Sequence, residues 1–356
     1  MNAPEHRQTK KVAVLMVDTF APLPILGPME MLNMACQFWK DATNDEVRGA
    51  TFETELVGMQ NKPLRFGRRV TLRPDATIAT ATTPDLIFIP ALGSVSESLK
   101  ANRGFVPWIK ACSSRGTRVV SFCTGSFLVA ATGLLDGRAA TTHWRHANLF
   151  HKMYPKVDLQ PDRLIVDEGN VITAGGATSF QDLILYLIEL YCGHEAAVVV
   201  AKNLLLNMGR QSQLPFTIFS AQKTHDDRQI LRVQTLMESQ TDRRLTIKEL
   251  AKLSGMSMRN FDRRFRNATG ESPSVYMQKL RVENAKRLLE TSSDTVQEIM
   301  WKVGYEDYRS FHRLFRAFTT LSPTGYRSKY GITNDDEKLA HSHRRNYRNK
   351  TAPTNV

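Results

Sequence analysis

The chain has 356 residues, 42% of them hydrophobic, and carries a formal net charge of +13. This length predicts two or three domains, each with its own core. No apolar run is long enough to span a membrane, and the polar first ten residues lack the apolar stretch of a signal peptide. The four cysteines show no paired spacing, which argues against a disulfide framework. We therefore expect a soluble cytoplasmic protein without a membrane partner.

The positive charge is concentrated near the C-terminus. Residues 1–228 contain 24 Lys/Arg and 21 Asp/Glu, a net charge of +3, whereas residues 229–330 contain 19 and 11, a net charge of +8. This uneven distribution favours a surface that binds phosphates over a general solubilising surface.

The first 200 residues alternate short apolar runs with helical patterns. Strands are predicted at residues 11–17, 52–59, 85–89, 116–122 and 170–173, and helices at 26–38, 105–114, 125–132, 179–191 and 195–206. Strands that alternate with crossover helices predict a parallel sheet with both faces covered. We assign residues 10–208 to this α/β domain and the polar residues 209–228 to an interdomain linker.

A cysteine lies where a predicted strand turns into a helix, in the run Ser-Phe-Cys-Thr-Gly at residues 121–125. The small residues two positions on either side of Cys123 suit the tight turn of a nucleophile elbow. A thiol at a helix N-terminus is expected to have a lowered pKa. His143 follows 20 residues later and is a candidate base for this thiol.

Residues around this turn are candidates for binding a small effector. The amide of Thr124 suits a carboxylate, the glycines after neighbouring strands allow close approach, and Asp182 would face a cationic group. Phe20, Phe127 and Trp144 are candidate cation–π walls. The glycines lack the spacing of a dinucleotide fingerprint, so we predict no NAD and no other cofactor. The candidate effector-binding residues are Cys123, Thr124, Gly93, His143, Gly175, Gly176 and Asp182.

The C-terminal segment contains an internal repeat with an offset of 49 residues up to a shared glycine and 50 residues after it. Thr246, Glu249, Gly255, Phe261, Phe265, Pro273 and Tyr276 recur as Thr295, Glu298, Gly304, Phe311, Phe315, Pro323 and Tyr326. Each copy predicts a capped helix, a turn at the glycine and a basic second helix, which is a helix-turn-helix unit. Two copies, joined by a predicted helix over residues 274–290, would read two major-groove segments about 34 Å apart.

The second helix of each copy buries its phenylalanines and exposes polar residues, while Leu250 and Leu253 of the first helix are expected to face inward. Arg259, Arg263, Arg309 and Arg313 are the candidate base readers, and Arg264 and Arg266 are expected to contact phosphates. No metal site is predicted, because His312 has no partner at ligand spacing. The candidate DNA-binding residues are Arg259, Asn260, Asp262, Arg263, Arg264, Arg266, Tyr308, Arg309, His312, Arg313 and Arg316. The polar tail, residues 331–356, is predicted to be disordered.

Two family resemblances rest on these motifs. The runs RRFRNATGESPSVYMQKLRVENAKRLLE and VGYEDYRSFHRLFRAFTTLSPTGYR resemble the DNA-binding domain of AraC/XylS transcription regulators, over residues 229–330. One departure is Thr319-Thr320, where that family commonly carries Phe/Tyr-Gly. The run SFCTGSFLVAATGLLDGRAATTHW resembles the ThiJ/PfpI and class I glutamine amidotransferase-like domain, over residues 11–195. Together they imply a flavodoxin-like α/β parallel-sheet domain followed by an all-α domain with two helix-turn-helix units.

The resemblances imply a transcription activator that binds promoter DNA, acts on RNA polymerase and forms a homodimer. They also imply a small effector, such as an amino acid, an amine or a quaternary ammonium metabolite. Pro24 replaces the acid of many ThiJ/PfpI proteins, and Trp144 and Arg145 follow the histidine where amidotransferases carry a carboxylate. We therefore expect Cys123 and His143 not to be catalytic. Two alternatives stay open: a cysteine hydrolase or amidase that carries a DNA-binding domain, and a redox sensor that uses Cys123.

Overall fold

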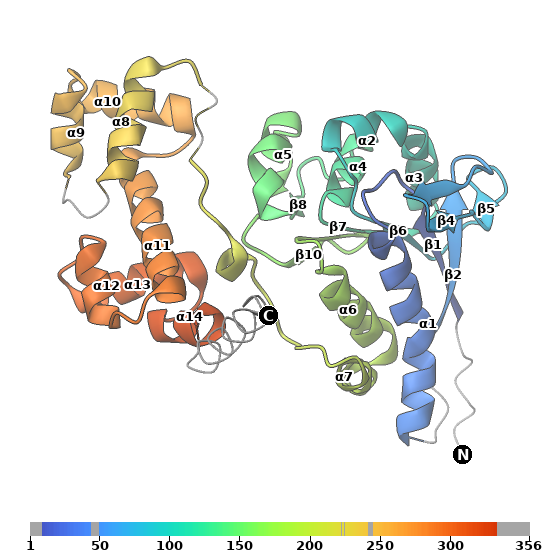
Figure 1. Ribbon diagram of the computed structural model, residues 1–356. Helices are drawn as coiled ribbons and strands as arrows, with labels where there is room; N and C mark the ends of the chain where they lie inside the picture. The colour runs from blue at the N-terminus through green and yellow to red at the C-terminus, as the bar shows by residue number, and fades with distance from the viewer. Residues whose placement is uncertain (1–8, 44–49, 222, 224, 241–244, 333–356) are drawn as a thin grey trace, which may run out of the picture. The chain divides into compact units, whose positions relative to one another are not determined.

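The computed structural model describes residues 9–43, 50–221, 223, 225–240 and 245–332. The chain divides into two compact units, Met1–Gln213 and Leu214–Val356 (Figure 1). The polar tail that is predicted to be disordered lies outside the described residues, apart from its first two positions. Among the described helices, none has both the length and the apolar character needed to cross a membrane.

The N-terminal unit is built on a seven-stranded sheet with the order β10-β11-β7-β6-β1-β2-β5. All paired neighbours are parallel except β10, which runs antiparallel to β11. The order β2-β1-β6-β7-β11 is that of a flavodoxin-like sheet, which confirms the predicted fold class. The strands are β1 (Thr9–Leu15), β2 (Thr51–Gly58), β5 (Ala76–Thr77), β6 (Leu86–Ile89), β7 (Arg118–Phe122), β10 (Ile165–Asp167) and β11 (Val171–Ala174).

Helices cover both faces of this sheet. Successive residues of each strand point to opposite faces, so each strand contributes side chains to a core on either side. Val12 and Val14 of β1 contact the core under α1, α6 and α7, whereas Ala13 and Leu15 contact the core under α2, α3, α4 and α5. The helices are α1 (Leu23–Thr43), α2 (Val95–Ala101), α3 (Phe105–Ser114), α4 (Gly125–Ala131), α5 (Ala147–Met153), α6 (Phe180–Cys192) and α7 (His194–Asn203), with a 3-10 turn at Trp144–His146.

The sequence patterns missed the shortest strands, which have only two or three residues and therefore no detectable period. Helix α1 begins at Leu23, three residues before the predicted start. Pro24 does not prevent this earlier start, since it lies in the first turn of the helix, where proline is tolerated. The missed strands are β5, β10, the pair β3 (Leu64–Phe66) and β4 (Val70–Leu72), and the pair β8 (Ala139–Ala140) and β9 (Asp158–Leu159).

The boundary between the units falls after Gln213, inside the segment that the sequence predicts to be a linker. Before the boundary, Arg210 forms an ion pair with Asp182 of α6, and Gln213 is buried in the N-terminal unit. After it, a 3-10 turn at Leu214–Phe216 and the half-buried Phe219 pack in the C-terminal unit. The predicted linker is therefore bound to one unit or the other over much of its length.

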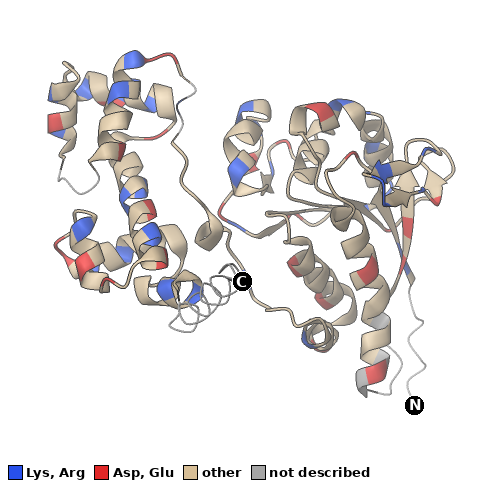
Figure 2. Ribbon diagram, viewed as in Figure 1, with Lys and Arg blue, Asp and Glu red and all other residues tan. Residues whose placement is uncertain are grey.

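The C-terminal unit contains two hydrophobic cores that share one helix. Phe261 and Phe265 lie in the first core, Phe311 and Phe315 lie in the second, and α11 contributes side chains to both. Lys and Arg occur on most helices of this unit, with Asp and Glu between them (Figure 2). The helices are α8 (Arg228–Ser239), α9 (Ile247–Leu253), α10 (Met258–Thr269), α11 (Pro273–Thr291), α12 (Val296–Lys302), α13 (Tyr308–Thr319) and α14 (Pro323–Tyr330).

Candidate functional site

The two helix-turn-helix units begin with the same capping box. The Glu249 amide donates to Thr246 Oγ1 at 3.2 Å and the Thr246 amide donates to Glu249 Oε2 at 2.7 Å. Thr295 and Glu298 repeat both distances in the second unit. These hydrogen bonds hold the pKa of both glutamates below its usual range. The predicted capping boxes are therefore confirmed.

Each unit turns at a glycine with a positive φ, 68° at Gly255 and 81° at Gly304. A side chain is strained in this conformation, so the repeated glycine is required by the turn. After α13 the corresponding role falls to Thr320, with a φ of 60°, where the first unit has Gly270. The departure of Thr320 from the AraC/XylS pattern thus places a β-branched residue in a conformation that favours glycine.

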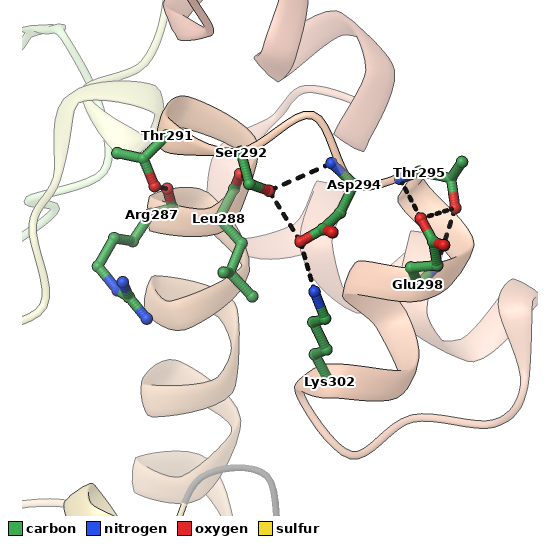
Figure 3. A network of polar contacts seen from close by, with 8 residues as sticks. All are labelled: Arg287, Leu288, Thr291, Ser292, Asp294, Thr295, Glu298 and Lys302. Atoms are coloured by element: carbon green, nitrogen blue, oxygen red, sulfur yellow. Dashed lines mark hydrogen bonds and ion pairs between the residues drawn. The ribbon is translucent and has the colours of Figure 1, made fainter.

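A network of polar contacts joins the end of α11 to both ends of α12 (Figure 3). Ser292 Oγ donates to the Leu288 carbonyl at 2.8 Å and contacts the Asp294 carboxylate at 3.0 Å. Asp294 in turn accepts from Lys302, the last residue of α12, at 2.6 Å. This network fixes the direction in which α12 leaves the shared helix.

The second helices, α10 and α13, present unpaired arginines. Ser257 and Asp307 cap them by accepting from the backbone three residues on. Arg259, Arg313 and Arg316 are exposed and form no hydrogen bond or ion pair with any residue that the structure describes. Their guanidinium groups are free to bind base edges or phosphates.

Other candidate residues on α10 are paired with each other at the surface. Arg263 donates to Asn260 Oδ1 at 3.1 Å, and Arg266 forms an ion pair with Asp262 at 2.8 Å. Exposed pairs of this kind contribute little to stability, so a nucleic acid can replace them. On α13, the ring of Tyr308 packs against the ring of His312, with centroids 4.0 Å apart and planes tilted by 34°. Burial lowers the pKa of His312, which leaves this imidazole neutral at neutral pH.

Arg264 does not have the free side chain that a phosphate contact needs. Its guanidinium donates to both oxygens of Asp227, at 2.9 and 2.7 Å, and to Gln229 at 2.5 Å. Arg264 holds the pKa of Asp227 below its usual range. Leu314, at the same position of the second unit, packs against the core. We therefore correct the expectation for Arg264: it joins the start of α8 to α10, and the leucine in the second copy was the sequence signal for a packing role.

The inward orientation predicted for Leu253 is wrong. Its side chain is 66% exposed, whereas Leu250 and Ala251 are buried. Helix α9 has seven residues and ends at Leu253, so the last position turns away from the core. Trp301, near the end of α12, is likewise 54% exposed. Each unit thus presents one large apolar residue at the end of its first helix.

The turn at Cys123 has the geometry of a nucleophile elbow. Its φ is 54°, a left-handed value that side chains rarely adopt, and its amide donates to the Ala174 carbonyl at 2.7 Å. The Cys123 carbonyl accepts from Ser126 Oγ at 3.0 Å and from Thr142 Oγ1 at 3.1 Å. Strained backbone of this kind is commonly found at binding and active sites. The elbow predicted from the sequence is present.

The lowered pKa predicted for Cys123 is wrong. Its side chain is 6% exposed, and burial raises the pKa of the thiol to about 11, against the smaller opposing effect of hydrogen bonds from Thr124. Burial also lowers the pKa of His143 to about 4. The Nδ1 atom of His143 accepts from the Arg145 amide at 3.1 Å. In the described part of the chain, no hydrogen bond joins His143 to Cys123.

The carboxylates near the elbow have other roles. Pro24, at the position of the family acid, is buried, and Glu30 is exposed. Asp18 accepts from Ser98 Oγ at 3.1 Å and, through its carbonyl, from the Gly93 amide at 3.1 Å. Among the described residues, no carboxylate forms a hydrogen bond with Cys123 or His143. The same residues contain no group of three or more His, Cys, Asp or Glu suited to a metal ion.

Gly93, Cys123, Thr124, Gly175 and Gly176 follow the carboxyl ends of the adjacent strands β6, β7 and β11, but several of the predicted effector residues are engaged within the chain. The Gly93 amide is used by Asp18, and the cationic partner of Asp182 is Arg210 rather than an effector. A Cβ on Gly175 would overlap the side chain of Gln213. Thr124 Oγ1 donates to the Leu92 carbonyl at 2.9 Å. Gly176 has a φ of 79°, and a Cβ there would lie 3.9 Å from the Cβ of Ser179, an ordinary van der Waals contact.

The aromatic residues near the elbow do not form one wall. Phe127 is fully buried in the core, where it contacts Phe150 with ring centroids 4.8 Å apart, so its predicted role as a ligand wall is wrong. Phe20 is exposed, and Trp144 is half-buried with the Arg145 guanidinium 5.5 Å from its ring. Only Phe20 and Trp144 therefore remain candidates for contact with a cation.

Sequence reasoning missed Gln213, the last residue of the N-terminal unit. It is 2% exposed, and its carboxamide Nε2 lies within hydrogen-bonding distance of four oxygen atoms, at 2.8 to 3.3 Å. Its Oε1 accepts from the Trp144 amide at 3.3 Å. A single glutamine in a polar segment carries no pattern from which this role could be read.

A cavity of about 500 Å³ lies at the amino ends of the strands, whereas the elbow lies at their carboxyl ends. Its lining includes Lys10, Asp85, Arg118 and Tyr191, and none of the predicted effector residues. Ligands of open parallel sheets bind at the carboxyl ends of the strands, which is the elbow edge.

We expect Arg264→Ala to destabilise the C-terminal unit by about 1–2 kcal/mol, because Asp227 loses a charged, partly buried partner that donates two hydrogen bonds. This substitution should leave the salt dependence of DNA affinity unchanged. Arg266→Ala, in contrast, should reduce by about one the slope of the logarithm of the binding constant against the logarithm of the salt concentration. Thermal denaturation and DNA titrations at several salt concentrations measure both. A reduced slope for Arg264→Ala would restore Arg264 to the phosphate contacts.

We expect Cys123 to react with iodoacetamide slowly at pH 7, and its rate to rise about tenfold per pH unit up to about pH 10, because only the thiolate reacts. Peptide mass spectrometry of the full chain, with Cys123→Ser as the control, separates its reaction from that of Cys36, Cys112 and Cys192. A rate that is already maximal below pH 8 would indicate an activated thiolate and contradict a neutral thiol.

Comparisons with known proteins agree with this organisation. The DJ-1/PfpI family matches residues 10–190 and a helix-turn-helix domain matches residues 250–329. The chain is 27% identical to the HTH-type transcriptional regulator CdhR of Pseudomonas aeruginosa, over 87% of this chain and 89% of that protein. It is 24% identical to the HTH-type transcriptional regulator GbdR of the same species, over 90% of this chain and 84% of that protein.

A similarity to an enzyme is confined to part of the chain. The isonitrile hydratase of Pseudomonas putida is 30% identical over 43% of this chain and 65% of that protein. The two regulators, in contrast, align along most of their length and share both domains. The chain therefore belongs to the DJ-1/PfpI family and joins that domain to a C-terminal helix-turn-helix domain, the architecture of its relatives among transcriptional regulators.

Proposed function

We propose that the protein regulates transcription by binding a specific promoter sequence through α10 and α13. The observation that carries this proposal is the pair of capped units that expose free arginines on their second helices. Arg259, Arg263, Arg309 and Arg313 would read bases, and Arg266 and Arg316 would contact phosphates. Because α11 joins the two units, one chain would contact two successive major-groove segments, about 34 Å apart.

The proposal assigns a sensing role to the N-terminal unit. A small metabolite would bind at the elbow edge of the sheet, close to Cys123, Thr124 and His143, and shift the equilibrium between two states of the protein. The strained turn at Cys123 supports a binding role, because such strain persists where the surroundings impose it. The exposed Phe20 and the half-buried Trp144 favour an amine or a quaternary ammonium group.

Three properties of the elbow argue against an enzyme. The Cys123 thiol is neutral, His143 is not bonded to it, and no carboxylate orients either residue in the described chain. A Cys–His pair without these features lacks both an activated nucleophile and an oriented base. A buried neutral thiol is also a poor target for peroxide, which disfavours a redox sensor. The partial similarity to isonitrile hydratase keeps hydrolysis or hydration as the alternative to test.

The proposal includes promoter DNA as the partner of the C-terminal unit, and RNA polymerase as the target of activation. We also propose that the protein forms a homodimer and is located in the cytoplasm. Analytical ultracentrifugation with and without promoter DNA measures the oligomeric state directly.

We expect Arg263→Ala and Arg313→Ala each to relax sequence preference at one base pair, by about 1–3 kcal/mol, because each removes one candidate base contact. Selection of binding sites from a random duplex library, followed by titration of single-base variants, measures the loss. Arg287→Ala, which removes the same charge from α11, is the control. Equal weakening on all sequences would assign Arg263 and Arg313 to phosphate contacts instead.

We expect a thermal-shift screen against amino acids, amines, betaines and organic acids to find a ligand of the intact protein. A ligand at 100 times its Kd stabilises its domain by about 2.7 kcal/mol. The ligand should be recovered unchanged after incubation and should alter promoter affinity. A ligand that is consumed by wild-type protein but not by Cys123→Ser would establish an enzyme.

A further inference from the structure

We propose that Gln213 couples the elbow of the N-terminal unit to the chain segment that enters the DNA-binding unit. This inference rests on the proposed regulatory function and assigns one residue to the transmission of the signal. Gln213 is a positioning residue in this proposal, because it acts through the loop that follows β8 and through the peptide that follows it.

The first step is the connection between the elbow and this loop. The Cys123 carbonyl accepts from Thr142 Oγ1 at 3.1 Å and from Ser126 Oγ at 3.0 Å, and these two hydroxyl groups lie 2.8 Å apart. The Thr141 amide donates to Thr173 Oγ1 at 2.8 Å, on the neighbouring strand. The loop that leads into His143 is thus bonded directly to the strained residue of the elbow.

The second step is the connection between the loop and Gln213. The carboxamide Nε2 of Gln213 donates towards the Thr142 carbonyl at 2.8 Å, and its Oε1 accepts from the Trp144 amide at 3.3 Å. These two contacts lie on either side of His143. The same Nε2 lies 2.9 Å from the Pro161 carbonyl and 3.1 Å from the Arg163 carbonyl. A movement of the loop therefore changes the contacts of a buried polar group, which is costly when they are lost.

The fit around Gln213 is close enough to transmit such a movement. The carboxamide lies against Gly175, the first residue after β11, where a Cβ would overlap it. Gly175 has no positive φ that would require glycine for the backbone, unlike Gly176. The glycine at position 175 is therefore explained by the side chain of Gln213.

The third step is the connection from Gln213 to the reading helices. The next residue, Leu214, begins the C-terminal unit. Within that unit, the Phe219 amide donates to Glu283 at 3.1 Å and the buried Lys286 donates to the Thr217 carbonyl at 2.5 Å. Glu283 and Lys286 belong to α11, the helix that carries both helix-turn-helix units. Only a few residues of chain thus separate the loop contact from the shared helix.

Linkage makes this coupling measurable without knowledge of the effector. If Gln213 transmits a change from the elbow to DNA affinity, then DNA binding must change the elbow loop to the same degree. The probe is the DNA duplex that wild-type, full-length protein selects from a random library. Amide hydrogen exchange by mass spectrometry, with and without this duplex, reports on residues 141–146.

In the wild-type protein, we expect the duplex to change exchange at residues 141–146 by about fivefold or more, the lower range of ordinary allosteric coupling. In Gln213→Met, which keeps the volume but loses the hydrogen bonds, the duplex should bind with unchanged affinity and leave this exchange unchanged. Gly175→Ala should have the same effect by displacing the carboxamide. Gln211→Ala, which changes an exposed glutamine two residues away, should behave as wild type.

A purely structural role for Gln213 would lower the melting temperature and leave the DNA-induced change intact, and that result would overturn the proposal. No change in the wild-type protein on DNA binding would overturn it as well. If Gly175→Ala fails to fold, Gln213→Met decides alone. If no duplex is selected by wild type or any variant, the proposed function fails and this inference fails with it, which differs visibly from DNA binding without a response in the loop.

Discussion

The geometry of the C-terminal unit depends on α11, the one helix among those described that contributes side chains to both hydrophobic cores. With 19 residues it is about 28 Å long, close to one turn of DNA. Tyr276 packs in the first core and Leu289 packs in the second, so neither core can shift without the helix. The network of Ser292, Asp294 and Lys302 then fixes the start of the second unit on the end of this helix (Figure 3). The arrangement of α10 and α13 is therefore fixed within one chain by the helix that both cores share.

Burial decides the chemistry of the elbow in the N-terminal unit. The same packing that forms the core beneath α4 also removes water from the Cys123 thiol, and desolvation raises its pKa more than nearby hydrogen bonds lower it. Burial keeps His143 neutral in the same way. A site with an uncharged thiol and an uncharged imidazole offers shape and weak polarity to a ligand, not an activated nucleophile. This environment fits the similarity to regulators, which extends along most of the chain, better than the partial similarity to an enzyme.

The segment around Gln213 forms specific contacts within each of the two units. Arg210 and Gln213 are bonded to the N-terminal unit, whereas Thr217 and Phe219 are bonded to α11. The polar composition of residues 209–228 suggests a free linker. Ion pairs and hydrogen bonds before and after the unit boundary instead hold this segment in place. Residues 210–219 are therefore held by contacts within one unit or the other, unlike a long flexible linker.

The sequence by itself determined the order of the domains, the parallel sheet, the elbow and the two helix-turn-helix units, because these follow from local patterns: strand and helix periods, capping residues and glycines with positive φ. It did not determine the pKa of Cys123, because desolvation depends on side chains distant in the chain. The ion-pair partners of Arg264 and Asp182 could not be predicted for the same reason. Asp227 lies 37 residues from Arg264, and Arg210 lies 28 residues from Asp182. The burial of Gln213 was decided only in the tertiary structure, where two separate parts of the chain, at Thr142 and at residues 161–163, supply the oxygen atoms that accept from its carboxamide.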